Sequence, residues 1–263
     1  MPQATPAAAP AAPPALAPQV PAPPIVPAPA TDAVAVIGYA LRLPGCDSAG
    51  AYWEVLSEGR DCVAEVPRRR AELAGIEPAR LTGRCGGFLT GIERFDAGLF
   101  RILPAEAEAL DPRQRLFLEV AYACLEQAGY GGQRLSGTRT GVFVGAGSQD
   151  YLASRAGSAN PYWATSGSPA VLASRLSYFL DLQGPCVPVD TACSSSLVAV
   201  HLAVESLKRG ESQLAVAGGV HLNLTLANFG AFDQMGALAA GGRCRAFDAA
   251  ADGFVPGEGA VAV

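Results

Sequence analysis

The chain has 263 residues, of which half are hydrophobic and 16% are charged, and its net charge is −5. This length suits one large domain or two ordinary ones with a buried core, and the composition excludes a coiled coil and a disordered tail. Nucleic-acid binding is not expected, because the basic residues are scattered and the strongest run, Pro67 to Arg70, is interpreted as a solvated helix start followed by Glu72.

The seven cysteines contain no C-x-x-C pair, and the chain has only two histidines. Zinc-ligand spacing is missing, so no structural metal is expected. An odd number of free thiols fits the reducing cytoplasm best, and we expect the protein there. No apolar run reaches about 18 residues without a polar break, so no membrane span is expected.

Residues 1–30 comprise 11 Pro and 11 Ala and carry no charge. This composition cannot bury a core and is typical of a semi-rigid, extended linker of the polyproline II type. Such a linker commonly tethers the domains of a larger assembly, and the alternative is a plain chain end. We expect the folded domain to occupy residues 31–263.

The first predicted elements of this domain are a strand and a helix. Residues 33–40 (AVAVIGYA) form a continuous apolar run, which predicts a strand buried on both faces. Residues 51–59 have the apolar spacing of a helix, which should end at Gly59.

The clearest helix covers residues 111–130. Asp111 is expected to be its N-cap, a proline follows at the first helical position, and Gln114 completes the capping-box pattern. Gly129 is expected to end the helix. Cys124 lies on its apolar face, where we expect it to contribute packing rather than chemistry.

Strands and helices alternate over the rest of the chain. The predicted strands cover residues 140–147, 186–190 and 213–220, and the predicted helices cover residues 168–184, with a glycine end, and 193–210. The alternation predicts a mostly parallel sheet with helices on both faces. The glycine turns match no phosphate-loop motif, so no nucleotide site is expected. Residues 261–263 read as a strand, and we expect that the sequence stops within a domain.

Cys193 lies where a predicted strand meets a predicted helix. A helix N-terminus offers free backbone N–H groups and partial positive charge, which stabilise a thiolate nucleophile and a developing oxyanion. The small residues Ser194 to Ser196 leave room for a substrate. The competing interpretation is a capped helix start with a packed cysteine, and position alone leaves both open.

The sequence offers no evident base for Cys193. His201 lies eight residues further along the same helix, about 12 Å away, and cannot reach the thiol. Nothing in the spacing places His221 near Cys193, so both histidines are interpreted as structural. The G-x-S-x-G motif of serine hydrolases is also missing.

Several stretches together resemble one enzyme family, the β-ketoacyl synthases, and within it the ketosynthase domains of modular polyketide synthases. VDTACSSSLVAVHLA is similar to the active-site signature of that family. The other matching stretches are VAVIGYALRLPG (34–45), LDPRQRLFLEVAYACLEQAGY (110–130), GTRTGVFVGAGSQDY (137–151) and GRCRAFDAAADGFVPGEGAVAV (242–263). The last stretch is most similar to synthases served by a separate acyltransferase.

The resemblance implies an α/β fold of the thiolase-like type, layered α/β/α/β/α from two similar halves, of which residues 31–263 would be the first. It implies a homodimer in which the strand at 186–190 pairs across the two-fold axis. The implied partners are an acyl carrier protein, a second ketosynthase subunit, and neighbouring synthase domains or an acyltransferase.

Carried over to this sequence, Cys193 receives the acyl chain as a thioester, and its backbone N–H forms part of the oxyanion hole. Phe232 would lie near the acyl pocket. No cofactor would bind directly, because the carrier protein presents the phosphopantetheine arm. The turn at 237–244 (ALAAGGRC) departs from the family's usual Ser-Pro-Asp-Gly-Arg-Cys pattern.

The implied reaction is a decarboxylative Claisen condensation between the Cys-bound acyl chain and a carrier-bound malonyl-type extender in polyketide biosynthesis. The family's two catalytic histidines and a lysine belong to its second half, and their motifs do not occur in these 263 residues. A nucleophile without its partners retains little of the rate, so the fragment alone is expected not to condense. The alternative is a non-elongating, ketosynthase-like module that transfers chains or organises the assembly.

Overall fold

The computed structural model describes residues 33–263 except for 75–76, 78–82, 148–150, 152–159 and 226, so the predicted linker at 1–30 lies outside the described residues. The strands are β1 (Ala40–Arg42), β2 (Ala64–Glu65), β3 (Cys85–Gly86), β4 (Thr140–Gly145), β5 (Cys186–Val189), β6 (Leu214–His221) and β7 (Gly259–Ala262). The helices are α1 (Ala49–Ser57), α2 (Arg68–Ala74), α3 (Pro104–Ala109), α4 (Pro112–Gln127), α6 (Trp163–Ser166), α7 (Pro169–Leu180), α8 (Ser195–Lys208) and α9 (Ala227–Gln234).

Five strands form one mixed sheet in the order β1-β7-β6-β4-β5. The strands β5, β4 and β6 are parallel, as the alternating pattern predicts. The strands β7 and β1 are antiparallel to their neighbours, which the pattern did not predict. Two neighbouring strands can be parallel only if a crossover, usually a helix packed on the sheet, carries the chain back between them. Of the described elements between β6 and β7, α9 is the one helix, and it is not among the helices that pack on the sheet, which fits the antiparallel direction of β7.

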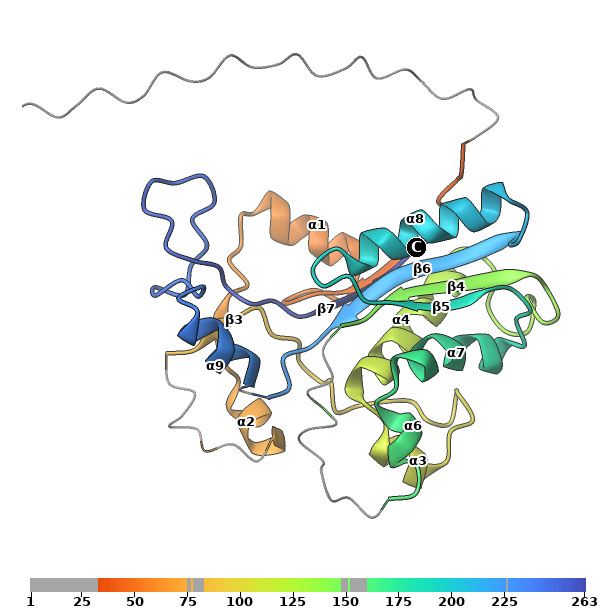
Figure 1. Cartoon of the computed structure of the whole chain (residues 1–263), viewed down its shortest axis with the longest axis horizontal. Helices are drawn as coiled ribbons and strands as arrows, with labels where there is room; N and C mark the ends of the chain where they lie inside the picture. Colours follow the sequence, from red (N-terminus) through yellow and green to blue (C-terminus); the bar gives the residue numbers. More distant parts are fainter. Residues whose placement is uncertain (1–32, 75–76, 78–82, 148–150, 152–159, 226) are drawn as a thin grey trace, which may run out of the picture. The chain divides into compact units, whose positions relative to one another are not determined.

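Helices cover both faces of this sheet, as expected (Figure 1). Helix α8 packs across β6, β4 and β5 on one face, and α4 and α7 pack on the other. The central strand β4 is buried along its whole length, so its TGVFVG sequence reads as one apolar run without alternation. The larger core lies between the sheet and the α4–α7 pair, where Phe117, Leu176 and Val142 are fully enclosed.

Helix α4 confirms the helix predicted at 111–130, with one correction. Asp111 caps it by accepting a hydrogen bond from the Arg113 N–H at 2.8 Å, and Gly129 follows its end with a positive φ of 83°. The predicted capping box is wrong. The Gln114 amide donates instead to the backbone carbonyl of Ser168, and its oxygen accepts from the Arg175 guanidinium. Gln114 therefore bonds to Arg175 on α7, 61 residues away, instead of to the backbone at the start of its own helix.

The strand predicted at 33–40 is wrong except for its last residue. Strand β1 begins at Ala40, whose partner on β7 is Ala262. The residues before it pair with none of the described strands and run past the end of α4, where the Tyr39 N–H donates to the Gln127 side chain at 2.6 Å. Val36 and Ile37 are 68% and 56% exposed. These apolar residues are therefore exposed, although the pattern predicts a buried strand.

The predicted glycine end of the helix at 168–184 is also wrong. Helix α7 ends at Leu180, and Asp181 follows in the left-handed conformation with φ 53°. Aspartate adopts this conformation more readily than most residues, and here its carboxylate also accepts a hydrogen bond from the Ser136 hydroxyl. Gly184 instead allows the backbone to pass close to Thr140, because a Cβ at position 184 would lie 2.4 Å from the Thr140 backbone.

None of the described helices is long and apolar enough to cross a membrane. Within the same residues, no group of three or more His, Cys, Asp or Glu side chains could hold a metal ion.

Candidate active site

Cys193 lies in the short turn between β5 and α8, at the carboxyl edge of the three parallel strands. Its side chain is exposed. The residue before it, Ala192, has a φ of 54°, a left-handed conformation that costs energy in any residue with a Cβ. Strained backbone of this kind clusters at functional sites, because the surrounding structure must hold it. The structure therefore favours the nucleophile interpretation over the packed cysteine.

The helix starts later than predicted. The first residue of α8 is Ser195, so Cys193 precedes the helix by two residues instead of opening it at 193. Ser194 is the N-cap, but its side chain makes no capping hydrogen bond and donates instead to the carbonyl of Thr191 at 2.9 Å. Cys193 therefore lies in the turn before the N-terminus of α8, and the N–H of Ser195, the first helical residue, donates to the Ala192 carbonyl at 3.1 Å.

Two glycines let α8 begin against the sheet. A Cβ on Gly145, at the end of β4, would lie 2.6 Å from both the carbonyl carbon of Ser195 and the backbone nitrogen of Ser196. A Cβ on Gly219, in β6, would lie 2.8 Å from the Cβ of Ser196. Because real side chains never approach so closely, only glycine at these positions allows the Cys193 turn to sit directly on the strand ends.

The turn is also supported from the start of α4. Arg113 forms a buried ion pair with Asp111 and donates from Nη1 to the carbonyl oxygen of Gly147 at 2.5 Å. Gly147 in turn adjoins Asp190, whose carboxylate oxygen would lie 3.3 Å from a Cβ on that glycine. The same oxygen accepts a hydrogen bond from the Ala192 N–H at 3.1 Å. The sequence offered no signal for this chain of contacts beyond the polar type of each residue.

The other thiols occupy different environments. Cys124 is 3% exposed within α4, and burial raises its pKa to about 11, which confirms the packing role predicted for it. Burial also raises the pKa of Cys186. Cys244 is the other exposed cysteine, and its sulfur accepts a hydrogen bond from the Val255 N–H. Of the seven cysteines, all of them free thiols in the described part of the chain, Cys193 alone directly follows a residue with positive φ other than glycine.

Neither histidine lies in the turn. His201 is in the middle of α8 with an exposed side chain, and His221 is the exposed last residue of β6. Ser195 opens α8 and His201 follows six residues later, a rise of about 9 Å along the helix axis.

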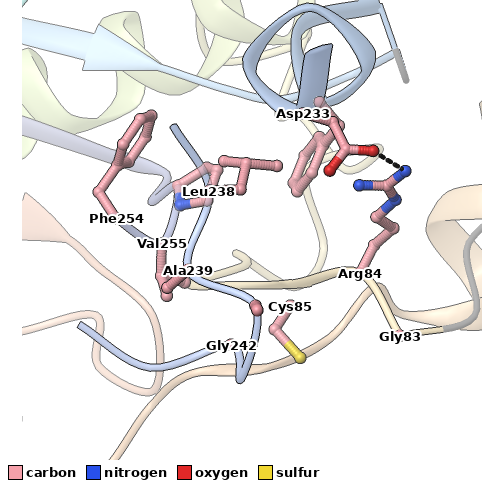
Figure 2. Close-up of a pocket in the computed structure, with 12 residues that line it drawn as sticks. Gly83, Arg84, Cys85, Asp233, Leu238, Ala239, Gly242, Phe254 and Val255 are labelled. Carbon is pink, nitrogen blue, oxygen red and sulfur yellow. Dashed lines mark hydrogen bonds and ion pairs between the residues drawn. The ribbon is translucent and has the colours of Figure 1, made fainter. Parts of the chain in front are cut away.

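Phe232 lies on α9 and forms an edge-to-face contact with Phe254 at 5.2 Å between ring centroids. Phe254 lines a cavity of about 100 Å³, to which Phe229 of α9 also contributes. Figure 2 shows Cys85, Leu238 and Phe254 around this cavity, with the Arg84–Asp233 ion pair at one side. Phe232 thus contacts one of the residues that line this cavity. Its predicted role near an acyl pocket stays a prediction.

The basic run at 67–70 is only partly solvated, which corrects the sequence interpretation. Arg70 is 6% exposed and forms a two-point ion pair with Glu258, at 2.5 and 2.9 Å. The Glu258 carboxylate also accepts from the backbone N–H groups of Leu89 and Asn223. Partners 188 residues apart explain why the local charge pattern missed this pair.

An exposed thiol on a strained strand-to-helix turn, at the ends of parallel strands, is an arrangement in which α/β enzymes carry a nucleophile. The chain belongs to the β-ketoacyl synthases, because the family model described as "Beta-ketoacyl synthase, N-terminal domain" matches residues 31–263.

Known relatives support this membership. The chain is 49% identical to one of the phenolphthiocerol/phthiocerol polyketide synthase proteins of Mycobacterium tuberculosis over 86% of its own length and 13% of that protein. It is 45% identical to polyketide synthase PksN of Bacillus subtilis over 86% of its length and 4% of that protein. The chain thus spans a small part of the curated relatives that it matches.

Solved structures confirm the predicted thiolase-like α/β fold. The ketosynthase from module 6 of the bacillaene synthase of Bacillus subtilis 168 matches with a TM-score of 0.75 and 38% identity, over 86% of this chain and 37% of that one. The oxazolomycin ketosynthase domain OzmH KS7 of Streptomyces albus matches with a TM-score of 0.76 and 39% identity, over 87% and 41%.

Proposed function

We propose that Cys193 is the acyl acceptor of a polyketide ketosynthase. The observation that carries the proposal is the exposed Cys193 thiol on the strained turn before α8, in a chain of the β-ketoacyl synthase family. The Cys193 thiolate attacks the carbonyl carbon of an acyl thioester on the phosphopantetheine arm of a carrier protein. A new carbon–sulfur bond forms, the phosphopantetheine thiolate leaves, and no cofactor bound to this chain takes part.

The second step proposed for the complete domain is the carbon–carbon bond. A malonyl-type extender loses CO2, and its enolate carbon attacks the Cys193 thioester and releases the thiolate. This step needs groups that stabilise the enolate, and the family's histidine and lysine motifs for it do not occur in these 263 residues. We therefore expect the 263 residues alone to accept an acyl group and not to extend it.

The proposed partners are a carrier protein, neighbouring synthase domains or an acyltransferase, and a second ketosynthase subunit. The dimer proposal is supported by β5, which is the edge strand of the sheet and pairs on one side only, with β4, among the described strands. An edge of this kind can pair with the same strand of a second copy.

Acylation tests the proposal directly. The chain is incubated with an acyl-pantetheine thioester, and the acylated peptide is located by mass spectrometry. We expect acylation at Cys193, loss of the acyl group in Cys193→Ala, and unchanged acylation in the matched variant Cys244→Ala, which removes the other exposed thiol. Equal acylation of the Cys193→Ala variant would contradict the proposal.

A further inference from the structure

The hydroxyl of Ser195 bridges the two ends of the Thr191–Ala192 segment. Its oxygen accepts a hydrogen bond from the Thr191 N–H at 2.9 Å and donates to the Ala192 carbonyl at 2.6 Å. These groups flank the residue whose φ is 54°. A residue held in this region persists only where the surrounding structure fixes it. The Ser195 hydroxyl contributes two of these bonds from the helix side, and the Ser195 N–H also donates to the Ala192 carbonyl at 3.1 Å.

Ser195 cannot easily move away from this position. Its residue is 6% exposed, whereas Cys193 and Ser194 beside it are exposed. It also lies against Gly145, where a Cβ would come within 2.9 Å of the Ser195 Cβ. The buried hydroxyl is therefore a fixed part of the turn, and water has little room to replace it.

The hydrogen bonds of Ser195 are not those of an ordinary helix cap. A capping hydroxyl accepts from an N–H two or three residues further along the helix. Ser195 is already the first residue of α8, and its hydroxyl accepts from Thr191, four residues back. The Ser195 hydroxyl therefore stabilises the turn that precedes α8 and contains Cys193.

We propose that Ser195 is a positioning residue, whose hydroxyl holds the Thr191–Ala192 segment with Ala192 in its left-handed conformation and thereby fixes the position of Cys193 before α8. For the reaction, this inference rests on the proposed function, because the thiol needs this placement to attack a thioester. The placement itself is independent of acyl chemistry and can be measured with a simple alkylating agent.

The experiment measures alkylation of the full chain by iodoacetamide, in which a sulfur–carbon bond forms and iodide leaves. In Ser195→Ala we expect Cys193 to react about fivefold more slowly, the factor that one lost hydrogen bond of typical strength gives. The matched variant Ser174→Ala loses an exposed hydroxyl of α7, on the opposite face of the sheet, and its rate should stay within about twofold of the unmodified chain. Buried Cys124 is the internal control and should stay unreactive in every folded variant.

A purely structural role for Ser195 predicts the opposite result. General loosening of the fold would expose Cys124 and would leave Cys193 as reactive as before or more so. An unchanged Cys193 rate with Cys124 still protected would overturn the proposal.

A second comparison tests whether Ser195 acts through Ala192. Glycine adopts positive φ without strain, so Ala192→Gly should reduce the need for the hydroxyl. Adding Ser195→Ala to Ala192→Gly should then slow Cys193 less than it does in the original background. An equal slowing in both backgrounds would contradict a role through Ala192.

The two proposals fail in different ways. If Cys193 is alkylated as described but never accepts an acyl group from a thioester, the proposed function is wrong and the positioning role of Ser195 stands. If Cys193 is acylated but iodoacetamide alkylates the Ser195→Ala chain as fast as the unmodified one, the positioning role of Ser195 is wrong and the proposed function stands.

Discussion

The starts of α4 and α8 show two uses of the same structural element. The start of α4 is closed: Asp111, Arg113 and Gln114 are 1–4% exposed, and each of these side chains bonds to another protein group. The start of α8 is open: Cys193 and Ser194 are exposed, and short side chains bond the backbone of the turn. A helix start can present a reactive group only where no long side chain covers it.

The two starts also depend on each other. Arg113 holds the carbonyl of Gly147, and Gly147 adjoins the Asp190 carboxylate that accepts from the Ala192 N–H. The closed start of α4 thus supports the open start of α8 through Gly147 and Asp190. Changes at each start should separate these two roles.

The largest effect is expected from opening the closed start with Arg113→Met. This change leaves the Asp111 carboxylate buried without its partner, which typically costs about 3–5 kcal/mol in the free energy of unfolding. The control is Arg209→Met, which removes an exposed pair with Glu205 at the end of α8 and should cost less than about 1 kcal/mol. Urea denaturation measures both, and equal losses would show that the buried pair is not structural.

A pH-dependent effect should distinguish the thiol within α4 from the rest of the chain. Burial raises the pKa of folded Cys124 to about 11 from 9.0. The unfolded chain therefore loses this proton first, and stability is full below pH 9 and falls as the pH rises towards 11. The loss due to Cys124 reaches about 2 kcal/mol at pH 11.

The variant Cys124→Ala isolates this contribution from other groups that titrate in the same range. Its stability should fall less than that of the unmodified chain between pH 8 and pH 10.5 in urea denaturation. Parallel curves for the two proteins would show that Cys124 is not buried as described.

A smaller effect is expected from Gly145→Ala, which acts on the seat of the open start. The added Cβ would lie 2.6 Å from the backbone of Ser195, and such overpacking typically costs about 1–3 kcal/mol. Gly230→Ala is the matched control, because Gly230 lies within α9 with nothing near its Cβ position and should gain about 0.5–1 kcal/mol. Thermal unfolding measures the two opposite signs, and equal signs would contradict the close approach at Gly145.

Local patterns predicted most of the elements. The proline-and-aspartate start of α4 and the apolar run of β4 form as expected, since a cap and a buried strand depend on neighbours in sequence. The apolar run at 33–40 failed, because a strand also needs a partner strand and β1 pairs with β7 only from Ala40 onward. The sequence could not show where that partner ends.

The sequence by itself determined that Cys193 follows a strand, lies at a helix start and belongs to a family signature, since all three depend on consecutive residues. Only the tertiary structure decided that Ala192 is strained, that Ser195 is enclosed against Gly145, and that the turn is supported from α4. It also paired Arg70 with Glu258. Each of these features depends on groups far apart in the chain, and only the packing of the sheet and its helices brings such groups together.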